Sequence, residues 1–110
     1  MIYRDGYSTK VNARLSLQYN FFTTTNAAEN SDWNHWVFVR DSNGATWYCN
    51  GNVDNTESTF GDKSNVASQN FMIGYCPAWS CRAYFDVTKI RIYNRVLTSS
   101  EVEILYTNKA

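Results

Sequence analysis

This sequence contains little proline and histidine, and it has no excess of positive or negative charge. In 110 residues there are one Pro and one His, and ten basic residues balance ten acidic ones. Nucleic-acid binding and attachment to an anionic membrane both need clustered Lys and Arg, so neither is expected. No apolar run approaches the length of a transmembrane helix, so membrane insertion is not expected either.

The first residues also lack the apolar stretch of a signal peptide,. Two locations are therefore compatible with the sequence. Either the protein acts where it is made, or it reaches the extracellular side or the surface of a particle as part of something larger.

Cysteine is scarce as well, and its odd number excludes a complete disulfide framework,. Cys76 and Cys81 bracket a short loop. They either close it as a disulfide ring or remain reduced thiols like Cys49, depending on the compartment. A zinc site needs four ligands, usually in close pairs, and the single His with no second Cys pair does not supply them.

Aromatic residues are what the sequence has in excess, at 16% of the chain. Aromatic side chains favour half-buried β-strand surfaces, and they also stack on flat ligands. The hydrophobic content of 44% is ordinary for a folded protein, and the length suits one domain. We therefore expect a single domain over residues 1–110.

Alternation of apolar and polar residues predicts a mainly β structure. Strands are expected at 14–19, 21–25, 35–40, 45–49, 71–75 and 87–92. Asn50-Gly51 tolerates the positive φ that a tight turn demands. The polar segment 52–70 is expected to be a long loop.

The end of the chain changes to a helical period. Thr98 and Glu101 have the spacing of a capping box, in which the hydroxyl accepts from an early helical N–H group,. Val102, Leu105 and Tyr106 follow at helical spacing. We expect a helix over residues 99–106 that packs this apolar stripe on the sheet.

Four segments carry a more specific pattern: 33–39 (WNHWVFV), 47–51 (WYCNG), 71–74 (FMIG) and 90–98 (IRIYNRVLT) with the helix that follows. In this order they resemble the concanavalin A-like lectin/glucanase superfamily, in particular its laminin-G-like jelly-roll branch. The resemblance implies an all-β fold, an antiparallel jelly-roll β-sandwich with a short C-terminal helix.

The chain departs from that family in two places. Phe85 and Thr88 stand where its members usually carry a Gly and an Asp before the last strand. Residues 1–32 supply only two or three of its opening strands. The chain is therefore a minimal version of the fold, a fragment, or a domain that a partner completes. An incomplete sandwich exposes sheet edges, so we expect a homo-oligomer or a larger assembly.

Catalysis is not expected. The glucanases of this superfamily place their carboxylates in a Glu-x-Asp-x-x-Glu motif, which this sequence lacks,. His35 is the only histidine, and it lies in an expected strand at a position that is structural in the family,. Trp33, Trp36 and Trp47 lie in runs with buried periodicity and are expected in the core.

The resemblance and the aromatic residues together favour a non-catalytic carbohydrate-binding or adhesion module. Sugars stack on Trp or Tyr rings and hydrogen-bond with Asn, Asp or Arg. The candidate ligand-binding residues surround the loop between the paired cysteines: Tyr75, Trp79, Arg82 and Tyr84. Trp79 at the loop tip either meets the ligand or plugs the end of the sandwich.

No cofactor is expected apart from calcium, which laminin-G-like domains often bind through loop oxygens. Asp54 and Asp62 in the polar loop are the candidate metal ligands, although solvated loop polarity explains them equally well.

The alternative function is a structural surface or decoration protein of a large assembly, such as a virus or phage particle. Its partners would be neighbouring protein subunits instead of a glycan. A lectin should leave Trp79 exposed beside a concave rim. An assembly protein should bury an apolar patch or a sheet edge against its neighbour. Fold analogy alone does not separate the two.

Overall fold

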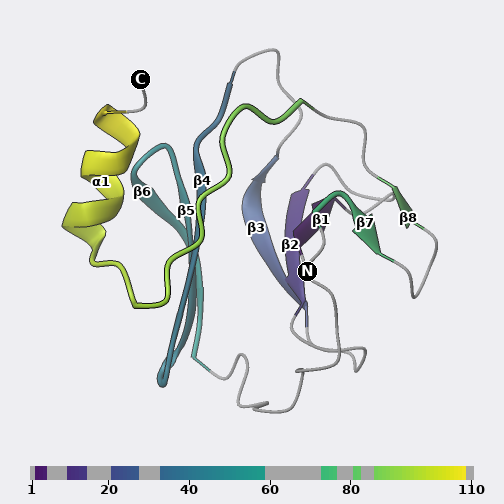
Figure 1. Ribbon diagram of the computed structural model, residues 1–110. Helices are drawn as coiled ribbons and strands as arrows, with labels where there is room; N and C mark the ends of the chain where they lie inside the picture. Colours follow the sequence, from purple (N-terminus) through teal and green to yellow (C-terminus); the bar gives the residue numbers. More distant parts are fainter. Residues whose placement is uncertain are drawn as a thin grey trace.

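The described part of the chain consists of antiparallel strands and one short helix. The computed structural model describes residues 2–4, 10–14, 21–27, 33–58, 73–76, 81–82 and 86–108 (Figure 1). The elements are β1 (Ile2–Arg4), β2 (Lys10–Arg14), β3 (Phe21–Ala27), β4 (Trp36–Asp41), β5 (Gly44–Cys49), β6 (Asn52–Glu57), β7 (Tyr75–Cys76), β8 (Cys81–Arg82) and α1 (Ser99–Thr107). The expected all-β class with a C-terminal helix is confirmed at this level.

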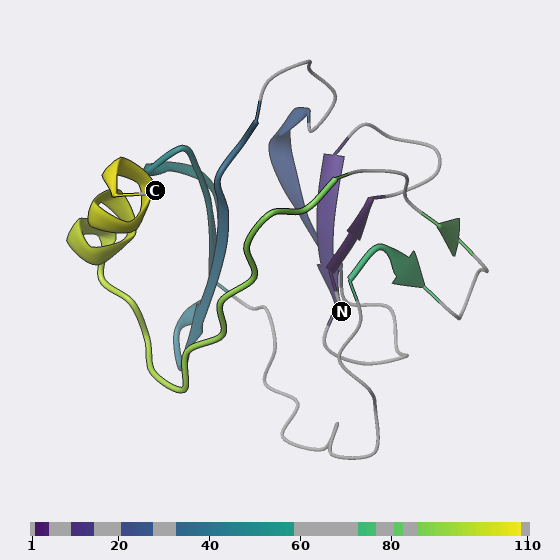
Figure 2. The ribbon, with the colours of Figure 1, turned by 45° about the horizontal axis from the view of Figure 1, so that its top comes forward.

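The strands form three antiparallel sheets, ordered β1-β2-β3, β4-β5-β6 and β7-β8. β3 lies against β6 and also approaches β5, while β1 approaches β7. Figures 1 and 2 show α1 covering one side of the β4-β5-β6 sheet, with β1-β2-β3 on the other side. Within the described ranges, no helix combines the length and the apolar composition that a membrane span requires.

The side chains of β4 alternate between two packed faces. Trp36 and Phe38 lie on the face away from α1, where their ring centroids are 6.2 Å and 5.0 Å from that of Trp47. Only 1% of Trp47 is exposed. Val37 and Val39 pack on the opposite face, toward the helix. Residues 36–39 are therefore partly covered on both sides, as the sequence predicts.

A second core lies between the sheet and α1. Its buried members are Tyr48, Leu97 and Val102, and Leu105 packs against them. Val102 is fully buried. The expected apolar stripe of the helix is therefore confirmed, because its residues meet the sheet at a spacing of three to four.

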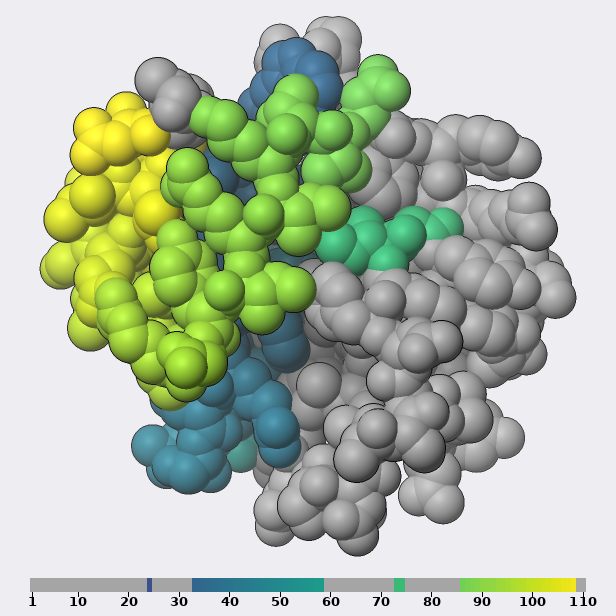
Figure 3. Space-filling model, viewed as in Figure 1, coloured from purple at the N-terminus to yellow at the C-terminus, as the bar shows by residue number. Residues whose placement is uncertain are grey.

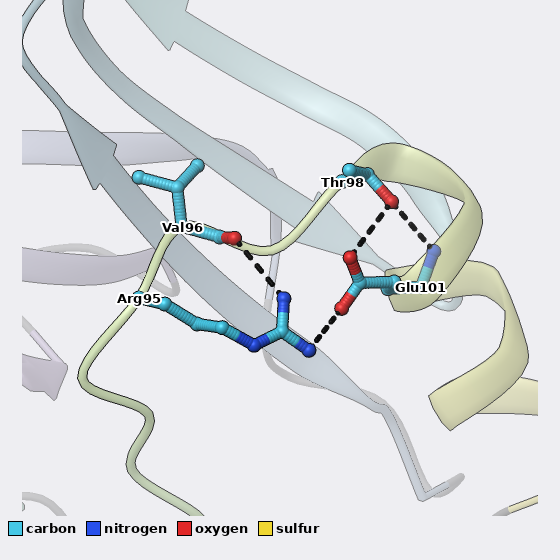
Figure 4. Close-up of polar contacts among 4 residues, drawn as sticks. All are labelled: Arg95, Val96, Thr98 and Glu101. Carbon is cyan, nitrogen blue, oxygen red and sulfur yellow. Dashed lines mark hydrogen bonds and ion pairs between the residues drawn. The ribbon is translucent and has the colours of Figure 1, made fainter.

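The capping box at the start of α1 is also confirmed. The Glu101 N–H donates to Thr98 Oγ1 at 3.2 Å, and the Val102 N–H donates to the Thr98 carbonyl at 3.0 Å. The Thr98 hydroxyl in turn donates to Glu101 Oε1 at 3.3 Å. The same carboxylate pairs with Arg95 at 2.5 Å, and Arg95 donates to the Val96 carbonyl (Figure 4). The bond from the Glu101 N–H to the Thr98 hydroxyl satisfies an early helical N–H group that has no backbone partner within the helix,.

Two expectations about strands are wrong. Residues 52–57 were expected to be loop but form β6, which pairs with β5 from Cys49↔Asn52 to Ala45↔Glu57. The turn at Asn50-Gly51 brings residues 52–57 back alongside β5. The backbone groups of β5 then pair with this polar segment, which forms a strand for that reason. Residues 87–92 were expected to form a strand, but the described residues between 86 and 97 belong to none. Their alternating pattern favours extended chain, yet a strand also needs a neighbour for its N–H and C=O groups.

The remaining expectations divide by position. β3, β4 and β5 confirm the strands expected at 21–25, 35–40 and 45–49. The strand expected at 71–75 is interrupted, because Gly74 has φ 82 and β7 begins only after it. A positive φ explains why glycine stands there. Of the strand expected at 14–19, Arg14 is the last residue of β2, and the remaining residues lie outside the described ranges.

Candidate binding surface

The predicted ligand-binding residues surround the β7–β8 hairpin. Its two strands are antiparallel, with Tyr75 directly opposite Arg82 in the register. The backbone register therefore pairs these two candidate positions, and their roles in binding stay a prediction. Trp79 and Tyr84 lie outside the described residues, so the structure leaves their predicted roles untested.

The same register places Cys76 directly opposite Cys81. Opposite Cα atoms of antiparallel strands are about 4.5 or 5.5 Å apart, within the range that a disulfide spans. The backbone is thus compatible with the ring that the sequence leaves open. Cys49, which lies in β5, is a free cysteine.

A network around Asn50 holds the start of β4 against the turn after β5. The His35 N–H donates to Asn50 Oδ1 at 2.9 Å, and the Asn50 N–H returns a bond of 2.8 Å to the His35 carbonyl. Asn50 Nδ2 also donates to Asn34 Oδ1 at 3.1 Å. One side chain therefore joins two segments that are fifteen residues apart.

The turn itself needs the residues that stand there. Asn50 has φ 51 and Gly51 has φ 84, so both central positions have the positive φ of a type I′ hairpin turn, as expected,. A Cβ on Gly51 would lie 3.2 Å from Cδ1 of Tyr106, which belongs to α1. The ring of Tyr106 also lies 6.0 Å from that of His35. The sequence signals at these positions are therefore structural: they dock the helix on the turn.

Trp33 does not belong to the core, which corrects the expectation from the sequence. It is 66% exposed. The reason is its position three residues before β4, where the alternation of the strand does not yet apply. Trp36 is partly buried and Trp47 fully so. Periodicity thus identified two of the three tryptophans correctly.

Trp33 directly precedes Asn34, which belongs to a set of hydrogen-bonded amide side chains. Asn52 Nδ2 donates to the Asn50 carbonyl at 3.4 Å, and Asn50 Nδ2 donates to Asn34 beside Trp33. Asn52 is exposed, while Asn34 and Asn50 are partly buried. An exposed aromatic ring next to oriented amide groups is the combination that holds sugars, by stacking and by hydrogen bonding. Sequence reasoning missed this surface, although the polar residues around Trp33 were a signal for it.

The candidate calcium ligands are not brought together within the described part of the chain. Asp54 lies in β6 instead of a loop, and Asp62 lies outside the described residues. Over the described ranges, no group of three or more His, Cys, Asp or Glu residues is placed to hold a metal ion. The effect of Asp54 is electrostatic: burial first, and then this carboxylate, raise the pKa of the Cys49 thiol,.

Comparison with known proteins identifies the fold to which this surface belongs. The family profile of the concanavalin A-like lectin/glucanases superfamily matches residues 3–103. No curated protein matches the chain.

One solved structure is similar to this chain: the 2.1 Å crystal structure of an S-layer domain-containing protein (residues 221–444) from Clostridium thermocellum ATCC 27405. The TM-score is 0.62 at 19% sequence identity, so the likeness concerns the fold. The match covers 88% of this chain and 50% of the crystallised one. The chain thus spans half the length of that crystallised chain.

Proposed function

Because this chain belongs to the concanavalin A-like lectin/glucanase superfamily, we propose that it is a non-catalytic carbohydrate-binding module that works in adhesion. Domains of this kind are generally non-catalytic, and the sequence lacks the carboxylate motif of the glucanases,. The proposal includes a complete jelly-roll sandwich, of which the strands described above form a part. Similarity to an S-layer domain-containing protein supports a place at a cell surface.

The exposure of Trp33 is the observation that carries this proposal. An exposed indole offers a flat apolar face on which a sugar ring can stack. The chain that follows Trp33 is held by the hydrogen bond from Asn50 Nδ2 to Asn34 Oδ1 and by the one from the His35 N–H to Asn50 Oδ1. Chain that is already held in place loses less conformational entropy when a ligand binds to it.

The β7–β8 hairpin is proposed as a second contact for the same ligand class. The register sets Tyr75 opposite Arg82 at the base of the loop that carries Trp79. A tyrosine ring can stack on a sugar, and an arginine can donate directional hydrogen bonds to its hydroxyl groups. A disulfide between Cys76 and Cys81 would hold that loop in one conformation.

Glycan binding by the full chain tests the proposal, first on a glycan array and then by titration of the best ligand. The Trp33→Ala variant should bind roughly tenfold more weakly. It loses the apolar area that a sugar buries on the ring, and about 0.5–1.5 kcal/mol of stacking beyond that area. The Ile104→Ala variant removes a different exposed apolar residue and should bind normally.

Each outcome of that experiment discriminates. Loss of binding in Trp79→Ala with normal binding in Trp33→Ala would move the site to the hairpin loop. Normal binding in both variants would contradict both proposed surfaces. Absence of binding to every glycan would leave the second function below as the better account.

A specific observation favours a second candidate function, contact with a neighbouring subunit of an assembly. Of the exposed large apolar residues in the described part of the chain, five lie in one segment: Val87, Ile90, Ile92, Tyr93 and Val96. A contiguous patch of exposed apolar residues often marks an interaction surface.

A further inference from the structure

The chain contains two Asn-Gly pairs, Asn43-Gly44 and Asn50-Gly51, which lie at opposite ends of β5. An asparagine followed by glycine loses its side-chain amide more readily than other asparagines, because no Cβ hinders the approach of the next backbone nitrogen. The turn after β5 lies beside α1, whereas the turn between β4 and β5 lies at the other end of the sheet (Figure 1). Figure 3 shows that end of the hairpin at the surface, at the lower left of the view. The two pairs therefore differ in their surroundings.

Asn43 belongs to the open end of the hairpin. Together with Ser42 it forms the turn that connects Asp41 to Gly44, which face each other in the register. Its backbone N–H donates to Asp41 Oδ1 at 2.7 Å, and the residue is exposed. Water therefore reaches Asn43, and the bond that holds it in the turn does not involve its side chain.

Asn50 is held by its side chain. Its Oδ1 accepts from the His35 N–H at 2.9 Å, and its Nδ2 donates to Asn34 Oδ1 at 3.1 Å. The residue is partly buried, and Tyr106 of α1 packs so closely on the turn that a Cβ on Gly51 would lie 3.2 Å from its Cδ1. A reaction at the side chain must first break both hydrogen bonds, which costs free energy. The folded structure therefore opposes the reaction at Asn50.

The fold makes different demands on the two residues of the open pair. Gly44 has φ 136, and a Cβ at this position would overlap the Glu57 carbonyl of β6. Glycine is therefore required there. The bond from Asn43 comes from its backbone N–H, which every residue except proline supplies,. Position 43 can therefore be substituted to test the reactivity of the pair without removing the bond that the turn uses.

We propose that Asn43 is a site of spontaneous deamidation and that the fold protects Asn50 from the same reaction. The backbone nitrogen of Gly44 forms a bond to Cγ of Asn43, the Cγ–Nδ2 bond breaks, and ammonia leaves with the proton of the Gly44 N–H. Water then adds to one of the two carbonyls of the cyclic imide, and the ring opens to aspartate or isoaspartate. Nothing is oxidised or reduced, and water is the co-reactant.

The product changes the end of the hairpin in two ways. Aspartate or isoaspartate at position 43 adds a carboxylate close to that of Asp41, and like charges repel,. Isoaspartate also carries the backbone through an additional carbon atom, which alters a turn that sets the register of β4 and β5,. Trp33 precedes the opposite end of β4, so the modification lies apart from the proposed glycan surface. The inference does not rest on glycan binding.

Incubation of the full chain in mildly alkaline buffer, followed by mass spectrometry, tests the proposal. Cleavage after Trp47 and Tyr48 places the two Asn-Gly pairs in different peptides. The peptide with Asn43 should gain one mass unit roughly ten times as fast as the peptide with Asn50, because only the second reaction must first break side-chain hydrogen bonds. In water labelled with heavy oxygen, each converted chain should take up one labelled oxygen atom. An isoaspartyl methyltransferase should methylate the isoaspartate fraction.

The unfolded chain is the matched control. In denaturant both pairs are open to solvent and should react at similar rates, so folding should slow the reaction at Asn50 strongly and at Asn43 little. Equal rates at the two residues in the folded protein would overturn the proposal. So would a rate at Asn43 that falls as strongly on folding as the rate at Asn50, because the hairpin would then protect both pairs.

The Asn43→Gln variant localises the reaction. A glutamine side chain is one carbon longer and closes a ring with the next backbone nitrogen far more slowly. The variant should therefore keep its mass in this peptide, while Asn50 behaves as in the parent protein. A mass gain that persists in this peptide would place the reaction at another residue and overturn the proposal. Glycan binding takes no part in these measurements, so failure of the proposed function would leave this inference standing.

Discussion

The β4–β5 hairpin with α1 and the segment 86–96 use similar residues to opposite effect. Both alternate apolar with polar side chains, and both include aromatic and β-branched residues. In the hairpin, Trp47 is 1% exposed, whereas Ile92 of the segment is 72% exposed. Composition and periodicity are thus nearly the same in the two regions, but the hairpin buries side chains that the segment leaves exposed.

The boundary between the two regions falls between two neighbouring residues. Val96 is 48% exposed, and Leu97 is 6% exposed and belongs to the core with Tyr48 and Val102. The difference arises where α1 folds back on the sheet and gives Leu97 neighbours. A β pattern therefore reports what a segment can do, while the strands and helices beside it decide whether its side chains are buried.

The largest expected effect comes from emptying the hairpin core. Trp47→Ala removes the ring that packs against Trp36 and Phe38 and should lower the free energy of unfolding by about 3–5 kcal/mol. Trp33→Ala removes an exposed ring and should change it by less than about 0.5 kcal/mol. Denaturant unfolding of both variants measures the contrast. Equal losses would show that exposure does not separate the two sites.

The packed hairpin and helix were also the parts of the fold that the sequence could predict. The β4–β5 hairpin and α1 were predictable because their signals are local: Asn50-Gly51 makes the turn and Thr98 caps the helix. The family was predictable from short motifs that hold these elements together. Each of these signals acts within a few residues and needs no knowledge of distant segments.

The predictions that failed depended on which strands lie next to a segment in the folded protein, and a sequence pattern does not show this. β6 looks like a loop by composition and becomes a strand because β5 offers it a partner edge. Residues 87–92 look like a strand and pair with none of the described strands. The exposure of Trp33 depends on where β4 begins, which periodicity does not fix to within three residues. The predicted site around Trp79 lies outside the described residues, so it stays a prediction.

A second contrast lies within α1 itself. Val102 is fully buried against the sheet, and Ile104, two residues later, is exposed. Val102→Ala should cost about 1.5–3 kcal/mol of stability through lost burial and the cavity left behind. Ile104→Ala should cost less than about 0.5 kcal/mol. Thermal and denaturant melts of the two variants check this. A larger effect at Ile104 would mean that a partner covers the outer face of the helix.

The helix cap marks the boundary between the exposed segment and the packed core, and its effect should be smaller. Thr98→Ala removes the hydroxyl that accepts from the Glu101 N–H and should destabilise the protein by about 1 kcal/mol,. Thr98→Ser keeps a capping oxygen and should restore most of that loss. Chemical denaturation compares the three proteins. If the serine variant is no more stable than the alanine variant, the hydroxyl does not act as a cap.

The smallest expected effect is the pH dependence of the ion pair beside that cap. The hydrogen bond from Arg95 lowers the pKa of Glu101 most, with smaller contributions from its charge and from Thr98. A carboxylate whose pKa is lower in the folded than in the unfolded protein adds stability above the unfolded value of about 4.3. That contribution is lost as the pH falls through the lower, folded pKa.

Unfolding midpoints measured between neutral pH and acid should reveal this loss as a difference between proteins. Arg95→Gln removes the main cause of the shift, so the variant should be slightly less stable than the parent at neutral pH. The two curves should converge as Glu101 becomes protonated. Salt should narrow the gap at neutral pH, because both side chains reach solvent,. A gap that persists undiminished at low pH would mean that Arg95 stabilises the helix start through the Val96 carbonyl and not through the carboxylate.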